Sequence, residues 1–200
     1  MKFEKKNVLI IAPHCDDEIL GCGGYISKYK NKKNFFILYL TNANKGDSIK
    51  YTEGLIKKIR NEAKKTSNFL GVKKIFFEDF PAPKLDTISS STISDKISNY
   101  LKLIRPSEVF LPFGNDTHID HQKVYISSIT ALRPFLNINK NLEKIYCYET
   151  LSETDFAIPN KKLFNPNFFV RLSQKNLEDK IKAIKMYKTQ IKTKPHPRST

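Results

Sequence analysis

The chain has 200 residues, of which 40% are hydrophobic, so it can form one domain with a sizeable core and is too short for two ordinary domains. Its 35 Lys and Arg residues exceed its 20 Asp and Glu residues, and the formal net charge is +15. This excess favours an anionic ligand, but the lysines are spread along the whole chain, as on an ordinary solvated surface. No segment approaches the roughly 18 apolar residues that a membrane span requires, so we expect a cytoplasmic protein.

Hydrophobic patterning alternates between two kinds of segment along the chain. Short apolar runs rich in β-branched and aromatic residues predict strands at 8–12, 35–40, 74–77, 109–112 and 145–148. Apolar residues at three- and four-residue spacing predict helices at 17–30, 52–70, 92–104, 119–133 and 175–190. Segments 81–91 and 150–167, with their Pro, Ser, Asn and Thr, are expected to be loops. This alternation predicts an α/β, Rossmann-like three-layer fold with a mostly parallel central sheet, in a single domain.

Imidazole and carboxylate groups follow the first predicted strand, in PHCDDE at residues 13–18. Loops at the carboxyl ends of parallel strands form the ligand crevice of such folds, which places this turn there. Asp16 and Asp17 alone could be a helix N-cap and a first-turn acid. His14 favours a functional interpretation, because its position three residues before an acid lets both side chains converge on one point.

A second polar cluster follows the fourth predicted strand, in FGNDTHIDHQ at residues 113–122. Three of the four histidines of the chain fall within these two turns. A doubly wound sheet brings strands one and four together where the strand order reverses, and two histidines with one carboxylate then make a catalytic metal site. The candidates in this second cluster are Asp116, His118, Asp120 and His121.

Together the two turns resemble the signatures of the PIG-L/LmbE-like N-acetylglucosaminyl deacetylases. The His-x-Asp-Asp-Glu signature stands at residues 14–18 and the His-x-Asp-His signature at residues 118–121. Weaker similarities extend over most of the chain, in LTN at 40–42, EAKKTSNFLGV at 62–72 and KIKAIKMYKTQ at 180–190. The resemblance implies one PIG-L/LmbE-like deacetylase domain over residues 1–200, which we expect to lack part of the family's C-terminal region.

Carried over by position, the resemblance implies a set of ligands and a general base. His14, Asp17 and His121 would bind Zn²⁺, with Fe²⁺ as the alternative ion, and Asp16 would be the base. Zinc lowers the pKa of its bound water toward ~7 and polarises an amide carbonyl, while a carboxylate off the metal takes the proton. His118 would polarise the carbonyl and protonate the leaving amine, and Asp120 would orient it.

Three positions depart from the family pattern. Cys15 and Ile119 each replace a common proline, and a thiol adjacent to a metal ligand is expected to point away from the metal. Arg60 is one residue out of register with an arginine that the family often carries, which puts substrate contacts there in doubt.

The expected function is removal of an N-acetyl or other N-acyl group from an amino sugar through a metal-activated water. A phosphate- or nucleotide-linked sugar would suit the positive charge, and a homo-oligomer is compatible with the sequence. Non-haem iron enzymes use the same ligand types, but a free Asp16 has no duty in oxygen chemistry. A two-metal phosphoesterase needs more carboxylate ligands than we can assign. A basic nucleic-acid-binding α/β module is a further alternative, but no binding motif is recognisable, so no nucleic acid is expected.

Overall fold

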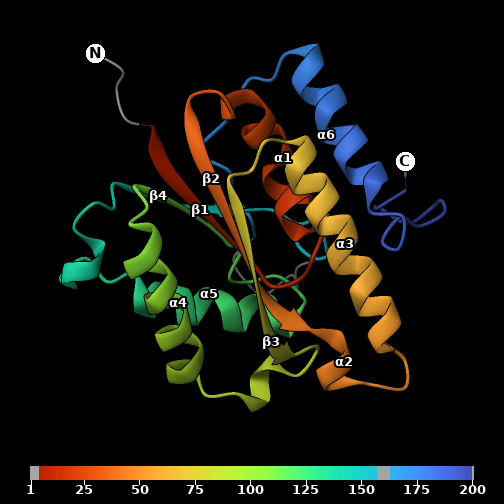
Figure 1. Cartoon of the computed structure of the whole chain (residues 1–200), viewed down its shortest axis with the longest axis horizontal. Coiled ribbons are helices and arrows are strands. Elements are labelled where there is room, and N and C mark those ends of the chain that lie inside the picture. Colours follow the sequence, from red (N-terminus) through yellow and green to blue (C-terminus); the bar gives the residue numbers. More distant parts are fainter. Residues whose placement is uncertain (1–4, 157–162, 200) are drawn as a thin grey trace.

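One parallel sheet forms the centre of the computed structural model, which describes residues 5–156 and 163–199 (Figure 1). The strand order is β3-β2-β1-β4-β5, and all four pairings are parallel. The strands are β1 (Lys6–Ala12), β2 (Lys33–Asn42), β3 (Lys74–Pro81), β4 (Glu108–Pro112) and β5 (Lys144–Tyr148). This arrangement confirms the predicted α/β fold with a parallel central sheet.

Helices cover both faces of the sheet, and this explains the continuous apolar runs of the central strands. One face carries α1 (Asp17–Tyr29), α3 (Glu53–Phe69) and α6 (Gln174–Met186), and the other carries α4 (Ser90–Ile104) and α5 (Ile119–Ala131) (Figure 1). Alternate residues of β1 enter the two cores: Val8 and Ile10 pack with the first group of helices, Leu9 and Ile11 with the second.

Several boundaries differ from the prediction. A one-turn helix, α2 (Ala43–Gly46), and two 3₁₀ turns, η1 (Leu85–Thr87) and η2 (Asn137–Asn139), were not expected, and η1 interrupts the predicted loop 81–91. Helix α4 begins two residues early because Ser89 caps it, accepting the Thr92 N–H at 3.1 Å. The last helix ends at Met186 rather than at residue 190, since Tyr187 leaves the helical conformation. Of the predicted loop 150–167, residues 157–162 lie outside the described residues, and the rest forms neither helix nor strand.

The reversal of strand order at β1 positions the candidate site. From β1 the chain adds β2 and β3 on one side, then crosses to add β4 and β5 on the other. The carboxyl ends of β1 and β4 therefore open side by side, and α1 and α5 start close behind them.

Close packing of α1 against the sheet accounts for one of the glycines that follow the first motif. A side chain at Gly21 would collide with the ring of Tyr148 at the end of β5.

Within the described ranges, none of the helices combines the length and the apolar composition of a membrane span.

Candidate active site

Hydrogen bonds close the loop after β1 into a rigid turn. The Thr41 N–H and hydroxyl, from the end of β2, donate to the Pro13 carbonyl at 3.2 and 2.7 Å. The His14 N–H donates to Asp17 Oδ2 at 2.9 Å, and Asp17, the first residue of α1, is fully buried. The three-residue spacing thus places the imidazole and the carboxylate on the same side of the turn.

The loop after β4 presents its histidines through the start of α5. His118 is the N-cap of this helix, and its Nδ1 accepts the Asp120 N–H at 3.2 Å. His121 lies in the first turn and is fully buried. Its Nδ1 lies 2.8 Å from Asp116 Oδ2, and Asp116 in turn accepts the Thr154 hydroxyl at 2.7 Å.

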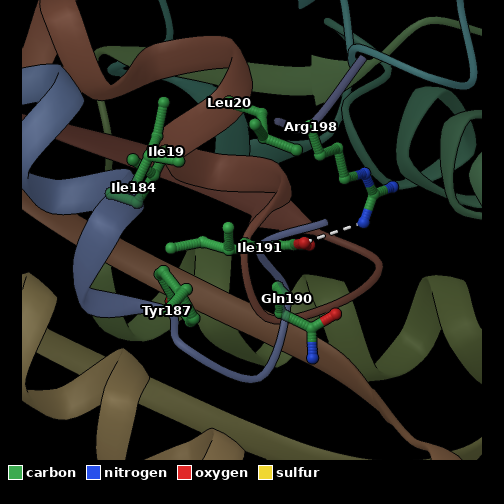
Figure 2. A pocket seen from close by; sticks show the side chains of 8 residues that line it. Ile19, Leu20, Ile184, Tyr187, Gln190, Ile191 and Arg198 are labelled. Carbon is green, nitrogen blue, oxygen red and sulfur yellow. Dashed lines mark hydrogen bonds and ion pairs between the residues drawn. The ribbon is translucent and has the colours of Figure 1, made fainter. Parts of the chain in front are cut away.

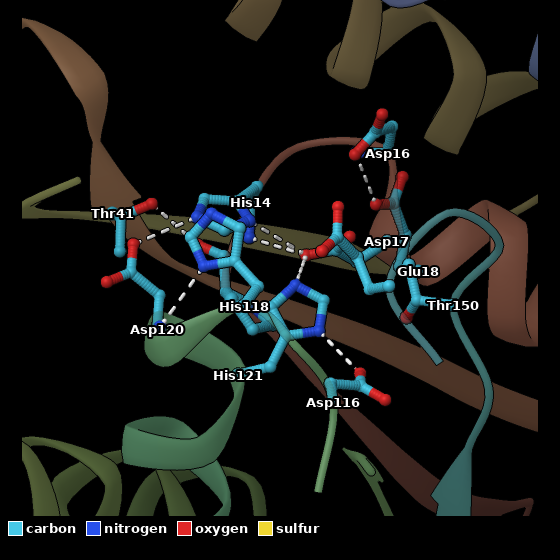
Figure 3. A network of polar contacts seen from close by, with 12 residues as sticks. His14, Asp16, Asp17, Glu18, Thr41, Asp116, His118, Asp120, His121 and Thr150 are labelled. Carbon is cyan, nitrogen blue, oxygen red and sulfur yellow. Dashed lines mark hydrogen bonds and ion pairs between the residues drawn. The ribbon is translucent and has the colours of Figure 1, made fainter. Parts of the chain in front are cut away.

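Three side chains that the sequence predicts as metal ligands converge on one point (Figure 3). Asp17 Oδ2 lies 3.3 Å from His14 Nδ1 and 3.3 Å from His121 Nε2. Ligand atoms that are about 2.0–2.1 Å from a tetrahedral ion lie about 3.3–3.4 Å from one another. The two distances from Asp17 match this value and all three ligand atoms lie within 4.8 Å of one another, an arrangement that suits a small divalent cation.

Two buried atoms of this cluster lack a hydrogen-bond partner within the described ranges: Asp17 Oδ1 and His121 Nε2. Leaving a buried donor or acceptor unsatisfied costs about 1–3 kcal/mol, more for a charged group. A cation held by His14, Asp17 and His121 would compensate such atoms, so the residues fit a metal.

A second group of converging side chains, His14, His118 and Asp120, is less suited to an ion. Both oxygens of Asp120 are already engaged, Oδ1 by the Leu85 N–H at 3.0 Å and Oδ2 by His14 Nε2 at 3.0 Å. Asp120 thereby fixes the ring of His14, as Asp116 fixes that of His121. Such carboxylate–histidine pairs set the tautomer and orientation of metal-binding rings.

The position of Asp120 differs from the role that the resemblance implied. Its carboxylate contacts His14 rather than His118, and only its backbone N–H reaches His118. The sequence also left Asp116 without a role. Its five-residue spacing from His121 within one motif was the available signal.

Opposite charges dominate the electrostatics of the cluster. Burial opposes protonation of both His14 and His121, but neighbouring carboxylates outweigh this effect. Asp120 and Asp17 raise the pKa of His14 to about 9. Asp17 and Asp116 raise the pKa of His121 to about 10. Burial alone would raise the pKa of Asp17, yet both histidines hold it well below its usual range. Bound protons thus occupy the places where a metal would compete with them.

Asp16 belongs to neither group of converging side chains. Its φ of 122° is strained for a non-glycine residue, and its N–H donates to Glu18 Oε2 at 3.0 Å. Its Oδ2 accepts from Arg198 Nη1 at 2.8 Å. Burial and the neighbouring charge of Asp17 raise its pKa to about 7, which suits a general base near neutral pH. The sequence placed Glu18 in the first signature but gave no role to Glu18 or Arg198.

His118 is held as a neutral ring. Burial, followed by the positive charges of His14 and His121, lowers its pKa to about 4. Because Nδ1 accepts a backbone N–H, the proton of the neutral ring is on Nε2.

Two of the departures from the family pattern have structural explanations. Cys15 packs against the core on the α1 face and is in neither group of candidate ligands. Arg60 donates to the Glu78 carbonyl at 2.9 Å and to Asp79 at 2.7 Å, so it is engaged at the end of β3.

These features define an α/β protein with a buried histidine–aspartate site at the switch point of its sheet. A family profile described as PIG-L, GlcNAc-PI de-N-acetylase, matches residues 9–132. The chain belongs to this family, which confirms the resemblance of its two motifs.

Similar proteins cover nearly the whole chain. An uncharacterized deacetylase, YaiS, of Escherichia coli strain K12 is 26% identical over 196 residues, which span 93% of this chain and 92% of the relative. The diacetylchitobiose deacetylase of Thermococcus kodakarensis is 27% identical and is aligned over 93% of this chain and 70% of its own length. The crystal structure of the conserved protein TT1542 from Thermus thermophilus superposes with a TM-score of 0.73, at 25% identity, over 93% of this chain and 80% of that one.

Proposed function

We propose that this protein is a metal-dependent N-deacetylase that hydrolyses the acetamide of an amino sugar. The observation that carries the proposal is the convergence of His14, Asp17 and His121, in which Asp17 Oδ2 lies 3.3 Å from one nitrogen of each histidine. The carboxylate of Asp16 is next in sequence but lies outside the ligand set. The named activity of the Thermococcus relative supports the substrate class. The positive charge of the chain favours sugars that carry a phosphate or a nucleotide.

His14, Asp17 and His121 would hold the metal, for which we propose zinc, with Fe²⁺ as the alternative. When bound, the ion supplies a Lewis acid and lowers the pKa of its water toward ~7. Asp120 and Asp116 orient the two histidine rings from behind.

The remaining steps belong to Asp16 and His118. The Asp16 carboxylate takes a proton from the attacking water, for which a pKa of about 7 is well suited. His118 donates its Nε2–H to the carbonyl oxygen as negative charge develops there. Collapse of the tetrahedral intermediate breaks the C–N bond, and the proton held by Asp16 passes to the amine nitrogen.

This division changes one role that the resemblance implied, in which His118 protonates the leaving amine. A neutral ring whose Nδ1 accepts a backbone hydrogen bond is a good donor to an oxyanion but a poor acid. Asp16 takes one proton from the attacking water and returns it to the amine nitrogen. The proton count therefore balances without a protonated His118.

The proposal is tested by measuring acetate release from N-acetylated sugars, sugar phosphates and nucleotide sugars. We expect the protein to release acetate from one of these substrate classes. The activity should be lost after treatment with a chelator and recovered when Zn²⁺ or Fe²⁺ is added. Turnover should be the same without oxygen, which separates hydrolysis from an iron-dependent oxygenation. Absence of acetate release across the panel by metal-loaded protein would overturn the proposal.

A further inference from the structure

Arg198 contacts Asp16 although 182 positions separate them in the sequence. The guanidinium makes three polar contacts: Nη1 with Asp16 Oδ2 at 2.8 Å, Nε with the Ser152 hydroxyl at 2.9 Å, and Nη2 with Glu153 Oε1 at 3.3 Å. The side chains of Arg198 and Asp16 are 16% and 7% exposed, so this ion pair is largely shielded from water. The planar guanidinium has further donors that bind Ser152 and Glu153, and these contacts fix the orientation of the group that binds Asp16.

The segment after α6 is folded so that it delivers this arginine. The Arg198 N–H donates to His196 Nδ1 at 3.0 Å, and the Ser199 N–H donates to the His196 carbonyl at 2.9 Å. Arg198 lines a small pocket together with Leu20 of α1 and Ile191 of the same segment (Figure 2).

The same segment also supports the backbone of Asp16. The buried Tyr187 donates its hydroxyl to Glu18 Oε1 at 2.5 Å, and Glu18 Oε2 accepts the Asp16 N–H at 3.0 Å. Asp16 is therefore held at its peptide through Tyr187 and Glu18, and at its carboxylate by Arg198.

We infer that Arg198 is a positioning residue that orients the carboxylate of Asp16 for proton transfer. Its guanidinium occupies Oδ2, and no described residue donates a hydrogen bond to Oδ1, so we assign the uptake of the proton to Oδ1. A base displaced by about 1 Å can lose roughly 10²-fold in rate. The inference rests on the proposed function, because Arg198 affects the reaction only by orienting Asp16, the proposed general base.

The experiment compares Arg198→Ala, Arg198→Lys and a matched control, Lys192→Ala, which removes an exposed positive charge from the same segment. We expect Arg198→Ala to lower kcat by roughly 10–10²-fold with little change in KM or metal content. Arg198→Lys should keep part of kcat, and free guanidinium at non-denaturing concentration should restore part of it to Arg198→Ala. Lys192→Ala should resemble the wild type.

A double variant separates positioning from other roles. If Arg198 acts through Asp16, Arg198→Ala should cost almost nothing further once Asp16→Asn is present. If the two substitutions lowered kcat by factors that multiply in the double variant, or if Arg198→Ala raised only KM, the inference would be overturned in favour of a substrate contact. A rise in kcat for Arg198→Ala would overturn it in favour of an inhibitory segment.

Denaturant unfolding of the wild type, Arg198→Ala, Asp16→Asn and the double variant measures how much the ion pair contributes to stability. This measurement does not depend on enzymatic activity. Coupling between the two substitutions in unfolding but not in kcat would overturn the positioning role and leave a structural ion pair. Failure of the proposed function has a different signature, namely a wild type that releases no acetate. Failure of this inference leaves an active wild type whose kcat survives Arg198→Ala.

Discussion

Asp116 and His121 form a fully buried pair, with Asp116 Oδ2 2.8 Å from His121 Nδ1, and this pair turns the opposite nitrogen of the ring toward Asp17. The Thr154 hydroxyl holds the other oxygen of Asp116. A loop that follows β5 therefore fixes a histidine that belongs to α5.

Replacing Asp116 by Asn should weaken metal binding without removing a ligand. We expect a roughly 10–10²-fold lower affinity, since the ring loses the charged partner that orients it and raises its basicity. Competition with a chromophoric chelator measures this change, and saturating metal should recover most of the turnover. Asp86→Asn, which removes an exposed carboxylate, is the matched control. Equal metal affinities for the two variants would contradict the role of Asp116.

Asp16 and Asp17 are neighbours with different expected duties. Asp17→Ala should lower metal content and activity together, because two protein ligands remain. Asp16→Asn should keep the metal and lose roughly 10²–10⁴-fold in kcat, the range for removal of a general acid–base group. Metal analysis and kinetics on the same preparations decide the assignment. It would be wrong if Asp16→Asn turned over normally or lost its metal.

His118 combines a helix cap with the proposed oxyanion contact, and two substitutions separate these duties. His118→Asn keeps an acceptor for the Asp120 N–H but removes the ring, so we expect near-normal stability, retained metal and a kcat lower by roughly 10²–10³-fold. His118→Ala should lose about 1 kcal/mol of stability as well. Thermal unfolding and kinetics measure the two effects. Normal turnover by His118→Asn would exclude the ring from the reaction.

Metal affinity should increase with pH up to the pKa of His121, about 10, and most steeply below the pKa of His14, about 9. Below this value the metal-free rings of His14 and His121 carry protons, and each ring must release its proton before the nitrogen can bind an ion. Affinity should therefore decrease as pH falls, by up to about 10²-fold per pH unit for two protons. Chelator competition at several pH values between neutrality and the His14 pKa measures the slope. An affinity independent of pH would contradict the ligand assignment.

Far from the site, Lys33 and Glu108 form a largely buried ion pair with N–O distances of 2.6 and 2.7 Å, and Glu108 also accepts the Tyr25 hydroxyl at 2.7 Å. Lys33→Met should cost about 1–3 kcal/mol of unfolding free energy, because it leaves a buried carboxylate without its cation. Adding Glu108→Gln should recover part of the loss, since the amide oxygen can still accept from Tyr25.

Denaturant unfolding measures these changes in stability. The exposed pair of Lys6 with Glu143 supplies the control, and Lys6→Met should have little effect. Equal losses of unfolding free energy for Lys33→Met and Lys6→Met would contradict the expectation that the buried ion pair contributes more to stability than the exposed one.

Local sequence was sufficient for the strands, most of the helices and the two polar turns. Apolar runs such as VLIIA at 8–12 identify buried strands because both faces of a parallel sheet are covered. Helix ends were less accurate, since they depend on side chains: Ser89 starts α4 earlier than its apolar spacing indicates, and Tyr187 ends α6 sooner.

The clustering of the candidate ligands was also predictable, because few arrangements of alternating strands and helices are open to a chain and the carboxyl ends of parallel strands share one edge. His14 and Asp17 stand three residues apart in one turn, so their spacing alone places them together. Their meeting with His121 required only that β1 and β4 be neighbours.

Only the tertiary structure decided which groups support the site. Asp120 reaches His14 across 106 residues, and Arg198 reaches Asp16 across 182. No local pattern encodes such contacts, because a side chain a few ångströms long finds its partner only after the strand order and the path of the last segment are fixed. The sequence determined which chemical groups face the crevice. Packing determined which carboxylate holds each histidine and which cation holds the proposed base.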